Sequence, residues 1–328
     1  MLARALLPPE RALSRWPAVT HERVLAALLV AEVLVFAAVG RRFLTADNLL
    51  EIVRVSADVG LLALALTPVI VAGGIDLSVG SLLGLSAVLF GALWRDAGMP
   101  IAVAGLLAVV AGAAGGALNA VLVARLRLPA LIVTLGTLSL FRGLCEGLTG
   151  GVANYTNFPD GFLFLGQGYV AGIPAQLPVF AAAAVGFWLL LHRTTAGRAL
   201  RAVGYSPEAA RHAGIPVDRR VATTYVLAGT AAGVAALLYV ARSGQAKADA
   251  GLGYELTAIT AVVLGGTSIF GGRGTVHGTL LGVFVLAVLS RGLTLADQPR
   301  ELAGILTGAL LVASIAAHRW LGRRGVQA

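Results

Sequence analysis

Apolar stretches recur along the whole chain and are separated by short polar segments. Several of them reach the length of about 20 residues that a helix needs to cross the hydrocarbon layer of a membrane. The pattern predicts an all-α polytopic integral membrane protein with about ten transmembrane helices. The predicted spans cover residues 24–39, 59–72, 79–94, 101–123, 129–148, 177–191, 221–241, 255–270, 276–289 and 301–317. They form one transmembrane domain, residues 24–317, between an N-terminal segment (1–23) and a C-terminal tail (318–328).

The longest polar run lies between the sixth and seventh predicted spans, at residues 192–220, and contains a short capped helix. Ser206 is suited to the N-cap, and Pro207 to the first helical position, where its missing N–H has no cost. Gly214 can adopt the left-handed conformation that ends a helix. The predicted helix consists of Ser206, Pro207, Glu208, Ala209, Ala210, Arg211, His212, Ala213 and Gly214.

Two interpretations of this helix remain open. With about two turns it is too short to be stable alone in water, which suits a helix that docks into a groove of another protein. The small side chains of Ala209 and Ala210 are then expected on its surface. The alternative is a solvated connector that happens to be capped.

Composition and charge support the membrane assignment. The chain is 58% hydrophobic and only 12% charged, about half the charged share of an average soluble domain. The net charge of +9 comes from arginine, since Lys247 is the single lysine. No basic patch carries interleaved aromatic residues, so we expect no nucleic-acid partner, and the positive-inside rule explains the basic residues better.

Ten spans place both termini on one side of the membrane. An arrangement with both termini in the cytoplasm puts most of the 25 basic residues inside, as the rule requires, although Arg41, Arg42 and Arg54 count against it. We therefore expect a multi-pass protein of the bacterial inner (plasma) membrane, with the capped helix in the cytoplasm.

A carboxylate stands beside a glycine pair at the end of the second span. Gly73 and Gly74 allow the helix to unwind, Asp76 follows, and Ser78 can cap the next helix. A charged group in hydrocarbon is costly, so Asp76 is expected to face the protein interior. It either lines a polar pathway or serves only at the start of the third span, and the two roles are compatible.

A weak internal repeat accompanies this motif. Residues 65–74 resemble residues 259–266, and both stretches end in a glycine pair, Gly73–Gly74 and Gly265–Gly266. Interrupted apolar segments in corresponding halves mark the transport path of many transporters. Close packing of helices at small residues is the alternative explanation.

Other polar residues lie within the predicted spans. Arg142 and Glu146 are four residues apart and can form a pair near the outer end of the fifth span. Glu32 has no obvious partner. Asn119, Thr134 and Thr137 are candidates either for the pathway or for holding helices together.

No residue set for catalysis, a cofactor or a metal is apparent. Lys247 is not part of a phosphate-binding loop, so we expect no nucleotide site in this chain. The five histidines are scattered, and Cys145 is the only cysteine. Enzymatic activity therefore has no candidate residues.

Four motifs in order resemble the membrane subunit of bacterial ABC importers of the ribose-type sugar permease family, which belongs to the branched-chain-type permease superfamily. They lie at residues 73–81, 128–137, 197–215 and 263–278, within a resemblance that covers residues 45–317. Residues 137–143 and 162–169 look closest to rhamnose-type members, while permeases for ribose and autoinducer-2 share most of the motifs.

The resemblance implies a permease that works as a pair, either a homodimer or a heterodimer. A cytoplasmic ABC ATPase and a periplasmic sugar-binding protein are the other implied partners. Residues 206–214 then correspond to the coupling helix, and the solute is a monosaccharide or autoinducer-2. The rival functions are a stand-alone secondary transporter or channel, which needs ion-coupling carboxylates, and a membrane-embedded enzyme.

Overall fold

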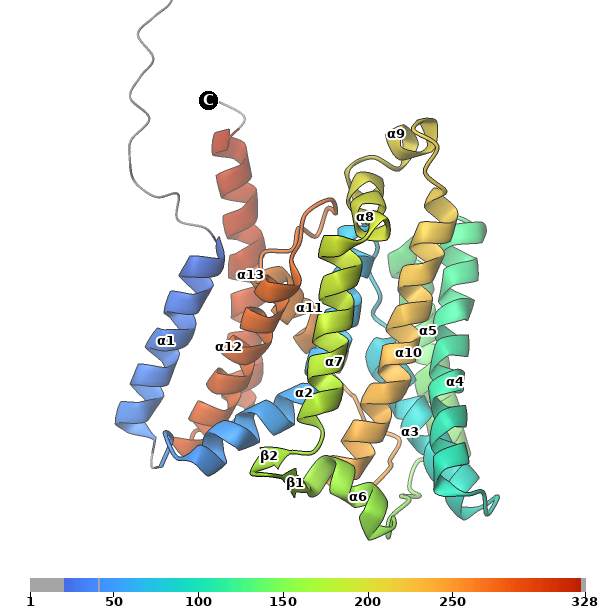
Figure 1. The fold of residues 1–328 in the computed structure, drawn as a ribbon, viewed down its shortest axis with the longest axis vertical. Helices are drawn as coiled ribbons and strands as arrows, with labels where there is room; N and C mark the ends of the chain where they lie inside the picture. The colour runs from blue at the N-terminus through green and yellow to red at the C-terminus, as the bar shows by residue number, and fades with distance from the viewer. Residues whose placement is uncertain (1–20, 41, 326–328) are drawn as a thin grey trace, which may run out of the picture.

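The computed structural model describes residues 21–40 and 42–325, and the described part is mostly helical (Figure 1). Its helices are α1 (His21–Val39), α2 (Ala46–Val71), α3 (Val79–Arg95), α4 (Ile101–Ala120), α5 (Ala130–Thr149), α6 (Asp160–Gln167), α7 (Leu177–Trp188), α8 (Thr195–Tyr205), α9 (Pro207–His212), α10 (Val217–Ser243), α11 (Tyr254–Leu264), α12 (Val276–Leu295) and α13 (Arg300–Gly325). A two-stranded antiparallel ribbon, β1 (Tyr169–Val170) and β2 (Ile173–Pro174), follows α6. The predicted all-α class is confirmed.

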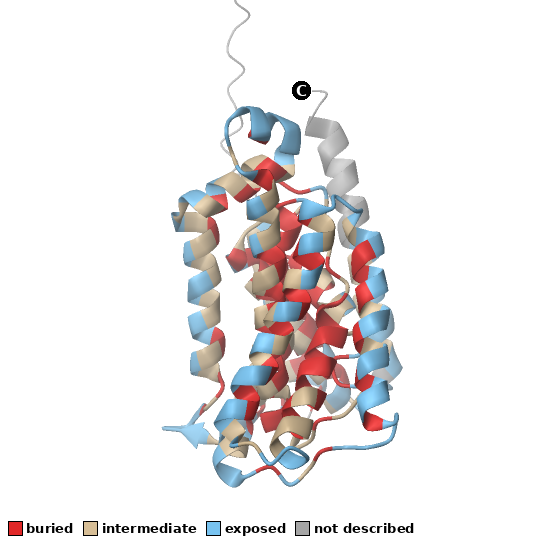
Figure 2. Cartoon of the chain, turned by 90° about the vertical axis from the view of Figure 1, so that its right-hand side faces the viewer, coloured by how far each residue is buried: buried red, intermediate tan, exposed pale blue. Residues whose placement is uncertain are grey.

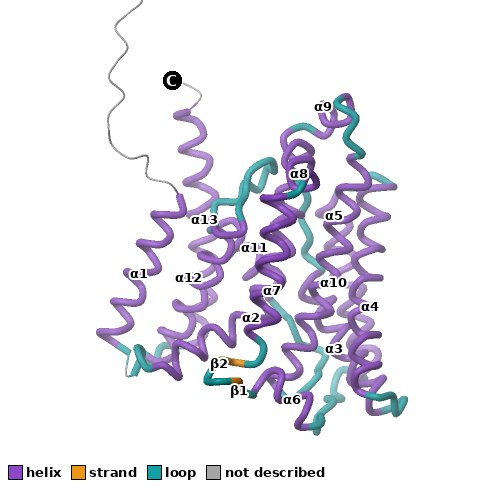
Figure 3. Tube along the Cα trace, viewed as in Figure 1, coloured by secondary structure: helices purple, strands orange, loops and turns teal. Residues whose placement is uncertain are grey.

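The longer helices run side by side along one direction, so the molecule has two distinct ends (Figures 1 and 3). We call the end that carries α8 and α9 the α9 end, and the end that carries α6 and the β-ribbon the α6 end. Helix α1 begins at the α9 end, where the His21 ring contacts the Leu264 carbonyl oxygen at 2.8 Å. Most of the two terminal segments expected from the sequence, residues 1–20 and 326–328, lies outside the described residues.

Helix α2 forms the centre of the core. Every residue from Gly60 to Val71 is buried, and the helix packs against α7, α10, α11 and α12. A helix that is apolar on all sides is covered either by lipid or by neighbouring helices, and here neighbouring helices surround it. Figure 2 shows the buried residues gathered in the interior of the bundle.

Glycines allow α4 and α10 to approach closely. A Cβ atom added at Gly112 of α4 would lie 2.5 Å from the Gly229 carbonyl oxygen and 2.9 Å from the Gly233 nitrogen of α10. Small residues permit such backbone contact between membrane helices, where dispersion replaces the hydrophobic effect as the driving force. The α4–α10 pair is therefore held by backbone packing.

Four described helices are long and apolar enough to cross a membrane: residues 101–125, 130–149, 217–243 and 276–295. The first of these includes a π-helical turn, Val121–Arg125, that continues α4. A fifth candidate joins residues 177–193 to α8 across a bend of 68°. The protein is thus a multi-pass membrane protein, while the number of ten spans and the orientation of the termini remain predictions.

Two predicted segments need correction at their boundaries. The polar stretch before residue 59 is not separate from the second span: Thr45 caps α2, which runs without a break to Val71. The span expected at 255–270 ends at Leu264, because a glycine pair stops α11 and leaves residues 265–275 outside any helix.

Two predicted loops also contain regular structure. The loop 150–173 holds α6 and β1, and β2 begins at its last residue. The polar run 192–220 holds two helices where one was expected, because Thr194 caps α8 by accepting a hydrogen bond from the Gly197 N–H at 3.2 Å. The cap at Thr194 was not predicted from the sequence.

The α4–α10 contact predicts a position-specific effect of one methyl group. Gly112→Ala should lower the free energy of unfolding by about 1–3 kcal/mol, since the new Cβ has no room. Gly186→Ala is the matched control, because nothing lies within 4 Å of a Cβ at this position of α7. Thermal unfolding in detergent measures both, and equal stability of the two variants would contradict the packing described.

Candidate functional site

The helix break expected at the first glycine pair is present. Helix α2 ends at Val71, and residues 72–78 are not helical. Gly73 has a φ of +84°, and its N–H donates to the Ile70 carbonyl at 2.9 Å. The Gly74 N–H donates to Val69 at 2.9 Å, which completes the paired hydrogen bonds of a glycine helix stop. The end of α2 is thus capped by hydrogen bonds of its own backbone.

Asp76 lies inside the protein, with a relative exposure of 1%. Its Oδ1 accepts hydrogen bonds from the Ser78 N–H at 2.9 Å and from the Ser78 hydroxyl at 2.7 Å. The Asn119 amide of α4 donates to the same Ser78 hydroxyl at 2.8 Å. Among the described residues, no ion pair joins Asp76 to a basic side chain. The carboxylate therefore organises the turn into α3 through hydrogen bonds.

Two other helices hold the unwound segment in place. The carbonyl of Ile75 accepts a hydrogen bond from the Tyr225 hydroxyl of α10 at 3.3 Å and from the Thr134 hydroxyl of α5 at 3.4 Å. Gly74 leaves room for this tyrosine, because a Cβ there would lie 2.7 Å from the Tyr225 oxygen. Thr137 bonds only within α5, to Val133 and Thr134. Of the two threonines considered, the structure brings Thr134 to the break.

The second glycine pair ends α11 with the same backbone pattern. Gly266 has a φ of +88°, and its N–H donates to Val263 at 2.9 Å. The next N–H, of Thr267, donates to Val262 at 3.2 Å. The position that matches Gly73 is thus Gly266, and Gly265 precedes it with an ordinary helical φ of −64°. The two helix ends are alike, while a repeat of the two halves stays a prediction.

The two breaks meet at the α9 end. The Gly272 N–H donates to the Val71 carbonyl, the last of α2, at 2.8 Å. A Cβ added at Gly271 would lie 3.0 Å from the Cα atoms of both Gly73 and Gly204. Gly204 belongs to α8, so the segment before α9 is in backbone contact with the end of α2 and with the loop that follows α11.

Both predicted caps of α9 are found. The Ser206 hydroxyl accepts from the Ala209 N–H at 3.2 Å, and Gly214 follows the helix with a φ of +78°. The expectation that Ala210 lies on the surface is wrong. Its relative exposure is 3%, and it packs against Val203 and Val217, which tie α9 to α8 and α10. The exposed residues are Pro207, Glu208, Ala209, Arg211, His212 and Ala213.

An acidic residue links α9 to the turn after α4. Asp218 accepts from Arg211 at 3.0 Å and from Arg127 at 3.4 Å. These side chains are about half exposed or more, so each pair contributes little to stability. A cavity of about 320 Å³ lies between these residues and the Gly73–Gly74 break. This cavity therefore separates α9 from the helix break at Gly73–Gly74.

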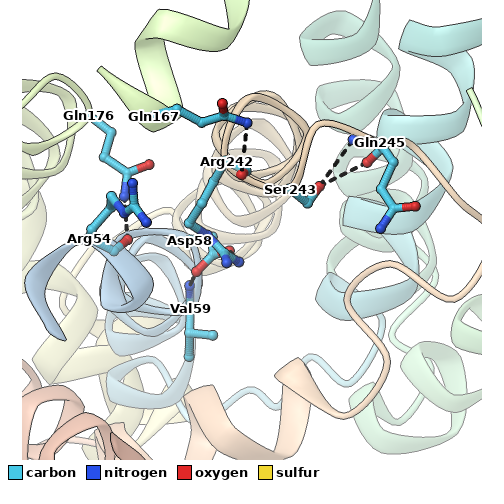
Figure 4. Close-up of polar contacts among 8 residues, drawn as sticks. All are labelled: Arg54, Asp58, Val59, Gln167, Gln176, Arg242, Ser243 and Gln245. Atoms are coloured by element: carbon cyan, nitrogen blue, oxygen red, sulfur yellow. Dashed lines mark hydrogen bonds and ion pairs between the residues drawn. The ribbon is translucent and has the colours of Figure 1, made fainter. Parts of the chain in front are cut away.

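A buried ion pair that was not predicted from the sequence lies near the α6 end. Arg242 of α10 donates to Asp58 of α2 at 2.6 Å, and the aspartate side chain is 1% exposed (Figure 4). The Gln167 amide of α6 donates to the Arg242 carbonyl at 3.3 Å. Charged residues inside a membrane are expensive and usually functional. The signal was available, because Asp58 immediately precedes an apolar run of α2 and Arg242 ends one in α10.

Two cavities lie toward the α6 end. One of about 340 Å³ sits between α2, α11 and α12 and carries several hydroxyl groups. Its polar lining residues are Glu51, Ser56, Tyr254, Thr257, Ser290, Arg291 and Thr294. The second cavity, of about 650 Å³, is lined by charged residues from α5 and from the loop after α10. Both have hydrogen-bonding groups suited to a polar solute.

The charges of the second cavity are arranged differently from the expected Arg142–Glu146 pair. Arg142 donates instead to the carbonyl oxygens of Ala248 and Ala250, the latter at 3.1 Å. Lys247 bonds to Asp249 at 3.1 Å, and this bond raises the pKa of Lys247 above its usual range. Arg142 and Lys247 are thus both bonded to the loop after α10 and not to Glu146.

The family of this chain is identified by comparison with known proteins. Residues 48–315 match the model of the branched-chain amino acid transport system / permease component family. The chain belongs to this permease family. The autoinducer 2 import system permease protein LsrD of Escherichia coli K12 is 40% identical over 318 residues, which cover 92% of this chain and 96% of that protein. The LsrD proteins of Shigella flexneri and of Escherichia coli O157:H7 have the same identity and coverage. No solved structure matches the chain.

The permease match includes both helix breaks, α9 and the Asp58–Arg242 pair, and it leaves out α1. The elements that meet around Val71 therefore lie in the part of the chain shared with the family. Among the described residues, no group of three or more acidic, histidine or cysteine side chains is arranged to hold a metal ion.

The hydrogen bonds of Asp76 predict different outcomes for two substitutions. Asp76→Leu leaves the Ser78 N–H and hydroxyl without their acceptor, so the free energy of unfolding should fall by about 1–3 kcal/mol. Asp76→Asn keeps an acceptor oxygen and should retain most of the stability. Thermal unfolding of the purified variants decides this, and a leucine variant as stable as wild type would refute the structural role. Transport by a stable asparagine variant then tests separately whether the charge is required.

Proposed function

We propose that this chain is the membrane subunit of an ATP-binding-cassette importer for a small polar solute. The observation that carries the proposal is the 40% identity to an autoinducer 2 import permease over 92% of the chain. The solute is autoinducer-2 or a monosaccharide such as rhamnose or ribose. A cytoplasmic ABC ATPase, a periplasmic solute-binding protein and a second permease subunit are its partners.

The α9 end faces the cytoplasm in this proposal. Its exposed basic residues support the orientation by the positive-inside rule. They include Arg125, Arg127, Arg193, Arg198, Arg211, Arg219 and Arg273. The α6 end then faces the binding protein, and the two cavities near it would receive the solute. The hydroxyl groups around the smaller cavity suit a solute rich in hydroxyls.

Helix α9 is the coupling element. Its exposed residues, from Pro207 to Ala209 and from Arg211 to Ala213, offer a contact surface to the ATPase. Its buried Ala210 fixes it to α8, and α8 touches the end of α2 through Gly204. A movement of the ATPase would therefore reach the Gly73–Gly74 break, the pathway candidate, through contiguous packed contacts.

Cysteine labelling tests the orientation. Val152, 85% exposed near the α6 end, and the exposed Ala209 are each replaced by cysteine, and native Cys145 is buried. A membrane-impermeant maleimide should label Val152→Cys in intact cells stripped of their outer membrane, and Ala209→Cys only after the membrane is opened. Labelling of both positions from the same side would overturn the orientation.

Co-purification tests the coupling role. Wild-type protein should retain an ATPase subunit, identified by mass spectrometry of its phosphate-loop peptide, and show ATP hydrolysis stimulated by the loaded binding protein. Ala209→Trp enlarges the exposed face and should reduce this stimulation about tenfold or more, the effect expected at the centre of an interface. Val185→Trp, at a position of α7 that is 56% exposed and lines neither cavity, is the control, and unfolding temperatures verify that all variants are folded.

Failure of the wild-type protein to retain any ATPase would contradict the proposed function. Transport that persists in vesicles without ATP would instead favour a secondary transporter. If wild type couples and Ala209→Trp couples equally well, α9 is not the coupling element. Comparing autoinducer-2 with monosaccharides as the stimulating solute identifies the substrate.

A further inference from the structure

Among the residues whose exposure is described, the most exposed aromatic side chain at the α9 end belongs to the loop between α11 and α12. Phe270 is 81% exposed, and Tyr205, the last residue of α8, is 62% exposed. Together with Arg273 and the adjacent backbone they line a hollow of about 520 Å³ beside α8. Figure 1 shows this loop rising at the same end of the molecule as α9.

The loop is held in a defined shape. The Gly271 N–H donates to the Ser268 carbonyl at 2.9 Å, which closes a turn with Phe270 near its tip. The Ser268 N–H donates in turn to the Arg273 carbonyl at 3.0 Å. Phe270 therefore stands out from a structured turn, with its apolar ring left in contact with solvent.

The base of the loop is attached to α8. The Arg273 Nε donates to the Tyr205 hydroxyl at 2.8 Å, and its guanidinium lies 5.9 Å from the centre of the tyrosine ring. Tyr205 directly precedes Ser206, the N-cap of α9. The surface around Phe270 is thus continuous with the start of α9.

From these contacts we propose that the Phe270 tip is a second docking site for the ATPase, beside α9. The inference rests on the proposed function, in which α9 contacts that subunit. A subunit seated on α9 would also reach the adjacent surface, because Tyr205 directly precedes the N-cap of α9. An aromatic ring on a structured turn is a typical interface anchor, since little side-chain entropy is lost when it is buried.

The partner surface is defined by its chemistry. It has an apolar pocket for the Phe270 ring and acidic groups opposite Arg273, which is exposed and bonded to Tyr205. Since the Gly272 N–H bonds to the Val71 carbonyl, this second contact reaches the end of α2 without passing through α9. The ATPase would then hold the end of α2 through two separate elements.

Site-specific cross-linking identifies what touches the tip. A photo-reactive phenylalanine analogue is placed at position 270 in the full chain, expressed in its host membranes with its transporter partners. The expected product joins this position to a peptide of the phosphate-loop ATPase. Cross-links to lipid alone, to a second copy of this chain, or to no partner would overturn the proposal.

A matched pair of substitutions measures the contribution. Phe270→Ser removes an exposed ring and leaves the fold intact, and it should weaken retention of the ATPase and its stimulated activity roughly tenfold. Val185→Ser, at an exposed position of α7 that lines neither cavity, should leave both unchanged. Wild-type binding of the ATPase combined with an unaffected Phe270→Ser variant would overturn this inference alone. Absence of ATPase binding by wild type would overturn the proposed function as well.

Discussion

The hydrogen bond from the Gly272 N–H to the Val71 carbonyl is the contact on which the arrangement of the α9 end depends. A helix that stops within or near a membrane leaves backbone carbonyl groups without partners, and water is not freely available to replace them. Here the last carbonyl of α2 is satisfied by the loop that follows α11. The loop after α11 thus completes the hydrogen bonding at the end of α2, and the two helix ends depend on each other.

Glycine is required where these segments meet. Gly204 of α8 lies against the Val71 carbonyl and the Gly272 nitrogen, and a Cβ there would clash with both. Gly271 and Gly73 contribute the other two sides of the contact, each with positive φ. Since no side chain lies between these segments, a shift of α8 would directly displace the backbone at the end of α2 and in the loop after α11. This is a physical basis for linking a peripheral helix to the centre of the bundle.

The buried polar groups divide into two kinds. Asp76 carries a charge-bearing side chain without a basic partner among the described residues, and its hydrogen bonds come from Ser78. Asp58 has a basic partner in Arg242, which joins α2 to α10 near the α6 end. The first kind shapes a local turn, whereas the second joins two long helices. The ion pair offsets the cost of burying the charge of Asp58, whereas the burial of Asp76 is compensated by hydrogen bonds alone.

Local features of the chain were readable from the sequence, whereas contacts between distant segments were decided by the fold. Apolar run length predicted the helical membrane class, and Ser206, Pro207 and Gly214 predicted the ends of α9, because capping depends on neighbours within a few residues. The helix break at Gly73–Gly74 could be predicted from the sequence, because two adjacent glycines allow the backbone to leave the helical conformation. Burial of Ala210 did not follow, since it depends on how α8, α9 and α10 fold back on one another. The partners of Arg142 and the Asp58–Arg242 pair did not follow, since each joins residues far apart in the chain. Only the packed bundle brings the two helix ends and α8 together, because the hydrogen bond between Gly272 and Val71 links residues about 200 positions apart.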